Sequence, residues 1–511
     1  MNITSLVSQR AAWSPDAPAL IDSAAGRSLT FSDFDDEMAA MASALTRSGI
    51  MAGSRILLLL PVSAELFIIL AAILRAGCSA IFVDPSAGLK HLGDACTTTE
   101  PHAFIGVARA HLLCLSCPPL RRIPRRFVTD FPLPHADFLA PDKSRLETTQ
   151  VSPEAPAVIR FTSGTTGIPK AAVRTHGFLE RQFSVLTASL ELRAFERDMV
   201  TMPMFVMANL AAGLASILPR ADTRRTGACG DFSAEIHGHQ PTRIIAAPAL
   251  LERMADACLA RRIRMDCLRK IFTGGAPVFP RLFDKLSTVA PLASVTGVYG
   301  STEAEPIALL PGSALTNAVR ARITAGAGIP IGHPESNTAV RIFNPRGHSE
   351  TTFLSQEEFA AACVSQGEFG EIVVSGPHVL PAYLDPATTA SHKLRVGDTV
   401  WHRTGDIGYL SPDGSLWLLG RATSAGTAHR GSFHPLAIAA IAMTNPRVHQ
   451  ASALIHPGRR LLCVAPEGPS SFPDGLVDEI VVFPSLPVDH RHQSRIDHAA
   501  LAKLIENGCH P

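Results

Sequence analysis

The chain has 511 residues, of which 46% are hydrophobic, so it can bury sizeable cores and form more than one compact unit. Its 46 lysine and arginine residues balance 45 aspartate and glutamate residues, and the formal net charge is +1. This balance excludes a globally basic surface for nucleic acid and an acidic tail, so any anion site must be local.

The N-terminal residues 1–15 lack the continuous apolar core of a secretory signal. No span reaches the roughly 18 apolar residues that are needed to cross a bilayer. Leu66–Leu74 is strongly apolar but short, which is typical of a helix in a protein core. We therefore expect a soluble, cytoplasmic protein without a transmembrane segment.

The first half of the chain alternates between strand-like and helix-like patterns. Arg55–Leu60 predicts a strand, Ala64–Arg75 a helix and Ala80–Val83 a second strand. This strand, helix, strand order is typical of a mostly parallel sheet covered by helices.

A short loop rich in hydroxyls and glycines follows the predicted strand Ala157–Ile159 and precedes a strand and a helix within Ala171–Leu190. Glycines let a backbone approach anionic oxygens, while hydroxyls, N–H groups and a lysine supply donors and charge. The loop therefore predicts a polyphosphate site. It consists of Thr162, Ser163, Gly164, Thr165, Thr166, Gly167, Ile168, Pro169 and Lys170.

The strand and helix alternation returns in Arg243–Ala247, Ala249–Arg262 and Lys270–Thr273, which predicts a second α/β layer. Between Ala339 and Leu419 short strands replace most helices, and a hairpin is predicted across Pro412–Gly414. We expect an N-terminal domain over residues 1–420, with a β-subdomain at about 330–420, and a small C-terminal domain over 421–511, joined by a junction of small residues.

Two groups of metal-ligand residue types do not predict metal sites. Cys114 and Cys117 lack a second Cys or His pair at ligand spacing, so reduced and partly buried thiols are expected. The histidines 490, 492 and 498 lie in a basic stretch in which only Asp489 and Asp497 supply carboxylates, and a solvated turn is expected there.

Four further motifs can bind parts of a nucleotide. The double glycine in Thr273–Pro277 lets a flat ring lie against the backbone. Within Gly297–Glu303, Tyr299 offers a stacking face and Glu303 a ligand for a hard cation. Asp406, in the Arg403–Asp406 motif, can accept hydrogen bonds from two ribose hydroxyls. The fourth motif is the pair Gly420 and Arg421.

In this order, and together with the loop Thr162–Lys170, the motifs resemble the adenylate-forming superfamily, which includes acyl-CoA synthetases, peptide-synthetase adenylation domains and luciferases. The resemblance covers essentially the whole chain. It implies an α/β fold in which a large N-terminal domain has stacked, mostly parallel α/β layers and a β-subdomain. A small, mobile α+β C-terminal lid domain would follow.

The resemblance also implies ATP and Mg²⁺ as cofactors, and roles for individual residues. The loop from Thr162 to Lys170 would hold the β- and γ-phosphates. Thr302 would contact the α-phosphate, and Glu303 would bind Mg²⁺. Lys170, Thr302, Glu303 and Arg495 are the implied catalytic residues. The remaining implied ATP-binding residues are Gly274, Gly275, Ala276, Tyr299, Gly300, Ser301, Asp406 and Arg421.

The chain departs from the superfamily pattern at several positions. Arg495 stands where the superfamily places a lysine, and a planar guanidinium is not equivalent to a compact ammonium group. Thr423 replaces the usual hinge Asp or Lys. Pro203–Met207 lacks the histidine that is common in acyl-CoA ligases, and Arg430–Pro435 replaces a signature of the C-terminal domain.

Three stretches, Trp401–Leu410, Pro487–His492 and Pro203–Phe205, resemble the branch with the β-lactone synthetases of bacterial olefin biosynthesis, which also carries fatty-acid CoA ligase names. That branch activates a 3-hydroxy acid, whose own hydroxyl then closes the ring. Three hypotheses remain: a β-lactone-forming synthetase, a ligase that uses CoA or an acyl carrier, and a binder of nucleotide or acyl-adenylate without turnover. The implied partners are a small carboxylic acid, CoA or an acyl carrier, and other pathway enzymes.

Overall fold

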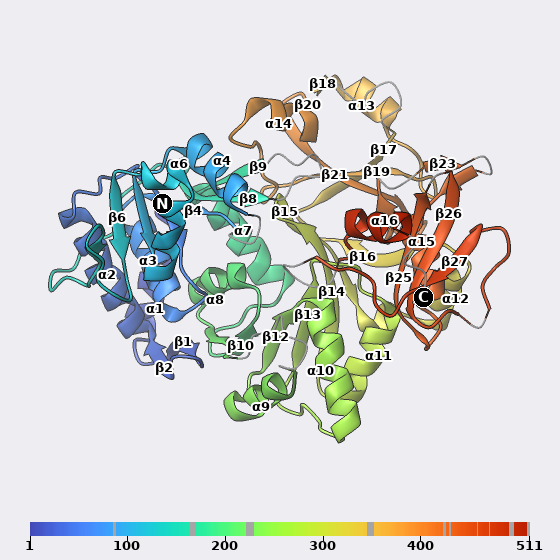
Figure 1. The fold of residues 1–511 in the computed structure, drawn as a ribbon, viewed down its shortest axis with the longest axis horizontal. Coiled ribbons are helices and arrows are strands. Elements are labelled where there is room, and N and C mark those ends of the chain that lie inside the picture. Colours follow the sequence, from blue (N-terminus) through green and yellow to red (C-terminus); the bar gives the residue numbers. More distant parts are fainter. Residues whose placement is uncertain are drawn as a thin grey trace. The chain divides into compact units, whose positions relative to one another are not determined.

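The computed structural model describes most of the chain, and secondary structure is shown in Figure 1. The described residues are 1–84, 88–162, 170–220, 229–344, 352–422, 426–428, 431–456, 458–469, 471–489 and 495–507; the side chains of residues 162, 229–231, 426–428, 431 and 432 are not described. The chain divides into two compact units. Unit 1 comprises Met1–Asp222, Gly238–Ile244 and Leu380–Ser391, and unit 2 comprises Thr223–His237, Ile245–Val379 and His392–Pro511.

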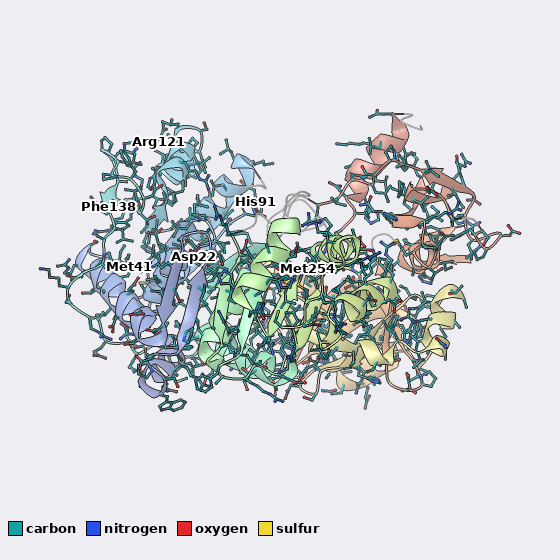
Figure 2. All side chains as sticks on the ribbon, turned by 90° about the horizontal axis from the view of Figure 1, so that it is seen from below. Asp22, Met41, His91, Arg121, Phe138 and Met254 are labelled. Carbon is teal, nitrogen blue, oxygen red and sulfur yellow. The ribbon has the colours of Figure 1, made fainter. Side chains whose placement is uncertain are left out.

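Unit 1 contains a seven-stranded sheet in the order β7-β6-β5-β3-β4-β8-β9. All neighbouring strands are parallel except β8 and β9, which pair in antiparallel fashion. Phe138 lies on the two-residue strand β7 at the edge of this sheet and is half exposed (Figure 2). The strands are β3 (Arg55–Leu59), β4 (Ser79–Phe82), β5 (Ala103–Gly106), β6 (Arg125–Val128), β7 (Asp137–Phe138), β8 (Pro156–Thr162) and β9 (Lys170–Thr175).

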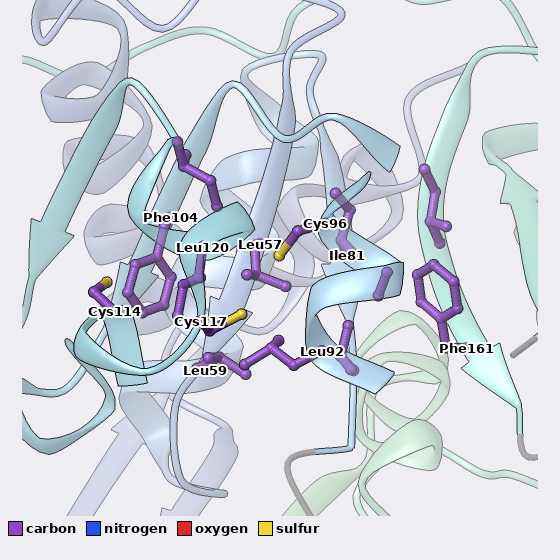
Figure 3. Close-up of a cluster of buried hydrophobic side chains, with 14 of the residues drawn as sticks. Leu57, Leu59, Ile81, Leu92, Cys96, Phe104, Cys114, Cys117, Leu120 and Phe161 are labelled. Carbon is purple, nitrogen blue, oxygen red and sulfur yellow. The ribbon is translucent and has the colours of Figure 1, made fainter. Parts of the chain in front are cut away.

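One face of this sheet packs on a core that includes Leu57, Ile81 and Phe104 from the strands and Leu92 from α4 (Figure 3). The helix α3 (Ala64–Arg75) begins where the Ser63 side chain accepts a hydrogen bond from the backbone of Leu66. Nearly every residue of α3 is buried, because its sequence is apolar on all sides.

The remaining strands of unit 1 are β1 (Pro18–Asp22), β2 (Arg27–Thr30), β10 (Arg197–Val200) and β11 (Ala215–Leu218). Strand β1 pairs with β2 in antiparallel and with β11 in parallel fashion, and β10 is parallel to β11. Its other helices include α1 (Thr4–Trp13), α2 (Phe31–Arg47), α4 (Leu89–Thr99), α5 (Ala108–His111), α6 (Pro118–Arg121), α7 (His176–Ser189) and α8 (Val206–Ala212).

Unit 2 is built on a run of strands in the order β13-β14-β15-β16-β22-β21-β19-β17. Only β13 and β14 are parallel in this run, and each of the other neighbouring pairs is antiparallel. The strands are β13 (Lys270–Gly274), β14 (Ser294–Ser301), β15 (Ala304–Pro311), β16 (Ile329–Pro334), β17 (Ala339–Phe343), β19 (Gly370–Ser375), β21 (Thr399–Leu410) and β22 (Leu416–Arg421).

Two short strands and several helices complete this part of unit 2. Strand β20 (Lys393–Val396) pairs with both β21 and β18 (Phe353–Leu354). The helices are α10 (Pro248–Arg261), α11 (Pro280–Val289), α12 (Asn317–Thr324) and α13 (Gln356–Ala362), while α9 (Cys229–His239), α14 (Pro386–His392) and strand β12 (Arg243–Ala246) cross the boundary between the units along the chain.

The end of the chain forms a small α+β region within unit 2. Strands β25 (Val448–His456), β26 (Arg459–Pro466) and β27 (Glu479–Val482) form a sheet, antiparallel between β25 and β26 and parallel between β26 and β27. The remaining elements are the short pair β23 (Gly426–Ala428) and β24 (Gly431–Phe433) and the helices α15 (Pro435–Ala442) and α16 (His498–Glu506).

The predicted α/β fold class is confirmed. The helix Ala64–Arg75 occurs as predicted, its flanking strands β3 and β4 lie within one residue of their predicted ends, and β21 and β22 form the hairpin that Pro412–Gly414 predicts. The boundary at residue 420 and the mobility of the lid stay predictions. No helix within the described residues is long and apolar enough to span a membrane.

Candidate functional site

The sequence motifs of unit 2 come together at the ends of β13 and β14. Gly274 is the last residue of β13, where an added Cβ would lie 2.3 Å from the carbonyl oxygen of Val298. The next residue, Gly275, has φ +82°, a conformation that side-chain-bearing residues rarely adopt. Both glycines are thus required by the backbone, and they leave this strand end without side chains where a flat ring could lie.

A polar cluster forms around Asp406 on β21. Tyr299 of β14 donates its hydroxyl to Asp406 Oδ2 at 2.7 Å, and Arg421 Nη1 donates to Asp406 Oδ1 at 2.9 Å. Asp406 and Arg421 lie directly opposite each other in the β21–β22 register. A carboxylate has about four acceptor positions, so Asp406 can still accept hydrogen bonds from ligand hydroxyls.

Burial and charge tune this polar cluster. Burial, followed by the charge of Asp406, raises the pKa of Tyr299 well above its ordinary value, so its hydroxyl remains a donor at neutral pH. Burial alone would lower the pKa of Arg421, but the charge and hydrogen bond of Asp406, together with the charge of Glu303, outweigh it and raise the pKa. The arrangement therefore presents a fixed carboxylate beside a permanent cation.

A second ion pair holds the irregular part of β21 that carries Asp406. Arg403 donates from Nε and Nη2 to Glu371 Oε2 at 2.9 and 2.7 Å. The other oxygen of Glu371 accepts from the backbone N–H of Gly405 at 3.1 Å, where φ is +70°. Thr404 Oγ1 donates to the carbonyl of Ile372 at 2.8 Å. These bonds fix the bulge from which Asp406 projects.

Glu303 lies in the turn between β14 and β15, where its backbone N–H donates to Ser301 Oγ at 3.2 Å. Its charge interacts with two buried residues, Lys393 and His402, that face each other across β20 and β21. Burial lowers the pKa of Lys393 to about 7, against the opposing effect of Glu303. Sequence reasoning missed Lys393, because an isolated lysine in a segment of short strands carries no motif.

Arg495 lies at the same strand end as the double glycine. Its Nε donates to the carbonyl oxygen of Gly275 at 2.7 Å, across 220 residues of sequence. Its backbone N–H donates to Asp489 Oδ1 at 3.0 Å, and its carbonyl accepts from the Asp489 N–H at 2.8 Å. The residue predicted to come from the C-terminal domain thus contacts one of the predicted adenine-pocket residues.

The structure describes only some of the other predicted site residues. Lys170 is the first residue of β9 in unit 1 and pairs in register with Thr162, the last residue of β8. Gly300 is the residue before the last in β14, Thr302 lies in the β14–β15 turn, and Ala276 follows Gly275. Predictions on Ser163, Gly164, Thr165, Thr166, Gly167, Ile168, Pro169, Thr423, Arg430, His490 and His492 lie outside the described residues.

Within the described residues, no group of three or more His, Cys, Asp or Glu side chains could hold a metal ion. The free cysteines include Cys114 and Cys117, and both are buried. Burial raises the pKa of the Cys114 thiol, which favours the neutral form.

The model of the AMP-binding enzyme family matches residues 7–384. The chain belongs to this family. The match covers most of the predicted N-terminal domain, including Lys170, the double glycine and the β14–β15 turn. The protein is therefore an enzyme of the AMP-binding family, and this membership supports an ATP-dependent ligase that forms an acyl-adenylate.

Curated relatives extend the similarity to most of the chain. An olefin β-lactone synthetase of Stenotrophomonas maltophilia is 28% identical, and the alignment covers 93% of this chain and 90% of the relative. An olefin β-lactone synthetase of Xanthomonas campestris is also 28% identical, and the alignment covers 85% of this chain and 80% of the relative. An indoleacetate–CoA ligase of Aromatoleum aromaticum is 31% identical over 53% of this chain and 49% of its own.

Solved structures share the fold. An anthranilate CoA ligase in complex with anthranoyl-AMP has a TM-score of 0.84 and is 16% identical, with 100% of this chain and 98% of the other covered. The O-succinylbenzoate CoA synthetase of Bacillus subtilis in complex with AMP has a TM-score of 0.76 at 19% identity, over 95% of this chain and 96% of its own.

Proposed function

We propose that this enzyme activates a fatty 3-hydroxy acid with ATP and closes the resulting acyl-adenylate to a β-lactone, releasing pyrophosphate and then AMP. The observation that carries this proposal is the similarity to olefin β-lactone synthetases over 93% of the chain. Family membership supports the adenylation step, and the relatives' names supply the ring closure and the substrate class.

The proposed binding of ATP follows the motifs. The loop Thr162–Lys170 holds the outer phosphates, and Thr302 contacts the α-phosphate. Adenine lies against Gly274, Gly275 and Ala276, with Tyr299 beside it. Asp406 accepts from the ribose hydroxyls, and Arg421 stays paired with it at 2.9 Å. The hydrogen bonds from Tyr299 and Arg421 to Asp406 support this assignment, because they fix its carboxylate before any ligand enters.

We assign the binding of Mg²⁺ to Glu303, whose carboxylate oxygen is a donor of the type that Mg²⁺ prefers. In nucleotide enzymes Mg²⁺ uses one or two carboxylates together with substrate phosphates and water. Glu303 supplies one such carboxylate in the β14–β15 turn, next to Thr302, which we assign to the α-phosphate. When bound, the ion would neutralise charge that develops on the phosphates.

Ring closure then needs no second substrate. The oxygen of the 3-hydroxyl attacks the acyl carbonyl carbon while the bond between that carbon and the phosphate oxygen breaks. AMP leaves with the bonding electrons, and the hydroxyl proton passes to solvent. A nucleophile in the same molecule has a high effective concentration, so the reaction does not depend on a binding site for CoA. The missing histidine in Pro203–Met207 supports this, since that position is a histidine in many acyl-CoA ligases.

The test is product analysis. The enzyme is incubated with Mg-ATP and matched pairs of fatty acids, with and without the 3-hydroxyl, in the presence or absence of CoA. We expect AMP, pyrophosphate and a β-lactone from the hydroxy acids without CoA, each followed by mass spectrometry. A thioester that appears only with CoA would overturn the lactone and leave the adenylation in place.

The second candidate function is an acyl-CoA ligase. The similarity to an indoleacetate–CoA ligase, 31% identical over 53% of the chain, favours it. The same assay separates the two candidates, because a ligase of this kind releases AMP efficiently with simple acids once CoA is present.

A further inference from the structure

Lys393 of β20 and His402 of β21 form a buried polar pair in unit 2 that has no role in the reaction proposed above. The two residues are 4% and 3% exposed and lie directly opposite each other in the register of their strands. Burying a lysine is costly, because its amine must give up contacts with water. A buried lysine beside a candidate nucleotide site is therefore a candidate for a functional role.

Strand register places the polar pair on one particular face of the sheet. His402 is opposite Lys393 on one side and Val374 of β19 on the other, so these three side chains share a face. Their neighbours in sequence point to the opposite face, where they belong to one core: Val373, Leu394 and Trp401. The polar pair therefore lies on the face away from that core.

The β14–β15 turn is anchored in the core on the face of the polar pair. Val374 belongs to the core that includes Ala304 and Val379. Ala304 is fully buried, begins β15 and forms a bridge with Val379. Glu303 directly precedes Ala304. The polar pair and the turn that carries Glu303 thus belong to the same side of this sheet.

Charge links the polar pair to Glu303. Burial lowers the pKa of both Lys393 and His402, and the negative charge of Glu303 opposes this in each case. His402 Nδ1 lies 3.3 Å from the carbonyl oxygen of His392, which can only accept, so this nitrogen carries a proton. The pKa of His402 is held well below its ordinary value, so its ring is neutral. Within the pair, Lys393 is therefore the group that can be a positive partner of Glu303.

We propose that Lys393 is a positioning residue for Glu303 and that it orients this carboxylate from the core side of the β14–β15 turn. The inference rests on the proposed function in one respect, the assignment of Mg²⁺ to Glu303. Removing a group that orients a metal-binding side chain typically costs about 10- to 100-fold in metal affinity. Lys393 would thus contribute to metal binding without being a ligand.

Nucleotide binding tests the proposal without turnover. An ATP analogue with a methylene group between the α- and β-phosphorus atoms is titrated into the enzyme by calorimetry, without any acid, once in Mg²⁺ and once in EDTA. We expect Lys393→Met to weaken binding about tenfold in Mg²⁺ and by less than about twofold in EDTA. Equal losses under both conditions would indicate a structural role, and unchanged binding would indicate none; either result would overturn the proposal.

Two further measurements separate positioning from a general disturbance. Arg395→Met is the matched control, because it removes an exposed cation from the same strand, and it should leave both affinities unchanged. In urea titrations, Lys393→Met should unfold at a midpoint no lower than that of the parent, since an apolar chain of similar length replaces a buried amine. If Lys393→Met does not fold, the uncharged Lys393→Gln decides by the same comparison of Mg²⁺ with EDTA.

A double variant shows whether Lys393 acts through Glu303. Glu303→Gln should weaken binding in Mg²⁺, and adding Lys393→Met to it should cause a further loss of less than about twofold. A further tenfold loss would show that Lys393 acts independently, and would overturn the proposal.

The same titrations distinguish this inference from the proposed function. If Glu303→Gln leaves binding in Mg²⁺ unchanged, the assignment of the metal to Glu303 fails. If Glu303→Gln weakens that binding and Lys393→Met does not, the positioning role alone fails. Whether the enzyme forms a lactone or a thioester has no influence on either result, because no acid is present.

Discussion

Asp406 and Arg495 reach the candidate site by different means. Asp406 projects from paired strands, and its carboxylate accepts hydrogen bonds from Tyr299 and from Arg421. Arg495 is exposed, and its Nε donates to the carbonyl of Gly275. Side chains from two other strands therefore hold the first residue, while the second is held at a strand end through a backbone oxygen. The following variants test this difference.

The largest effect is expected at Asp406. In Asp406→Ala, Tyr299 and Arg421 lose their shared acceptor, and the proposed ribose contact disappears. We expect kcat/KM for ATP to fall at least about 100-fold, measured by pyrophosphate release. Asp413→Ala is the matched control, because Asp413 lies in the same hairpin and accepts hydrogen bonds from the neighbouring Ser415. Equal losses in both variants would mean that the hairpin as a whole, and not the carboxylate, matters.

The next effect concerns Gly274, at the strand end that Arg495 contacts. Gly274→Ala places a Cβ 2.3 Å from the Val298 carbonyl oxygen, so the strand must shift. We expect a loss of about 2 kcal/mol in the free energy of unfolding, from urea titrations. Gly238→Ala is the control, since an added Cβ there meets open space within α9, and should stabilise the protein by up to about 1 kcal/mol. A Gly274→Ala protein as stable as the parent would contradict the close approach seen here.

Arg495 tests the less firmly held region. Arg495→Ala should lower AMP release about tenfold if the guanidinium contributes charge at the α-phosphate. Arg495→Lys should raise AMP release about threefold if the arginine impairs a step suited to a compact ammonium group. If AMP release is unchanged in both variants, Arg495 does not contribute to catalysis. An absence of AMP in the parent and in both variants would favour a nucleotide binder without turnover.

The smallest effect is a pH dependence that lies away from the site. His176 is fully buried, and its Nδ1 accepts a hydrogen bond from the Ile3 N–H at 3.1 Å. Burial lowers the pKa of His176 to about 4. The unfolded chain therefore binds a proton more readily, and stability is lost as the pH falls below the unfolded pKa of about 6.5.

Urea titrations at pH 7.5 and 5.5 measure this loss, and His176 should account for about 1 kcal/mol of it. His176→Asn, whose amide oxygen can still accept from Ile3, should reduce the difference by that amount. His237→Asn is the control at an exposed position on α9. An unchanged pH profile in His176→Asn would show that other groups cause the acid destabilisation.

Local sequence determined the elements of this protein. The helix α3 has the predicted ends, Ala64 and Arg75, and in the structure the Ser63 side chain caps its first turn ahead of the apolar run. The hairpin of β21 and β22 follows from Pro412–Gly414, where Gly414 takes a φ of +80°. The order of the nucleotide motifs identified the family, since each motif is short and contiguous in sequence.

Only the tertiary structure decided which distant residues meet. Sequence gave no sign that Arg495 would reach the carbonyl of Gly275, because backbone acceptors carry no residue identity. It also missed Lys393, whose burial and position opposite His402 follow from strand register. The cover on both sides of α15 was likewise unpredicted: an apolar sequence demands burial, but which surfaces supply it depends on packing between segments far apart in the chain.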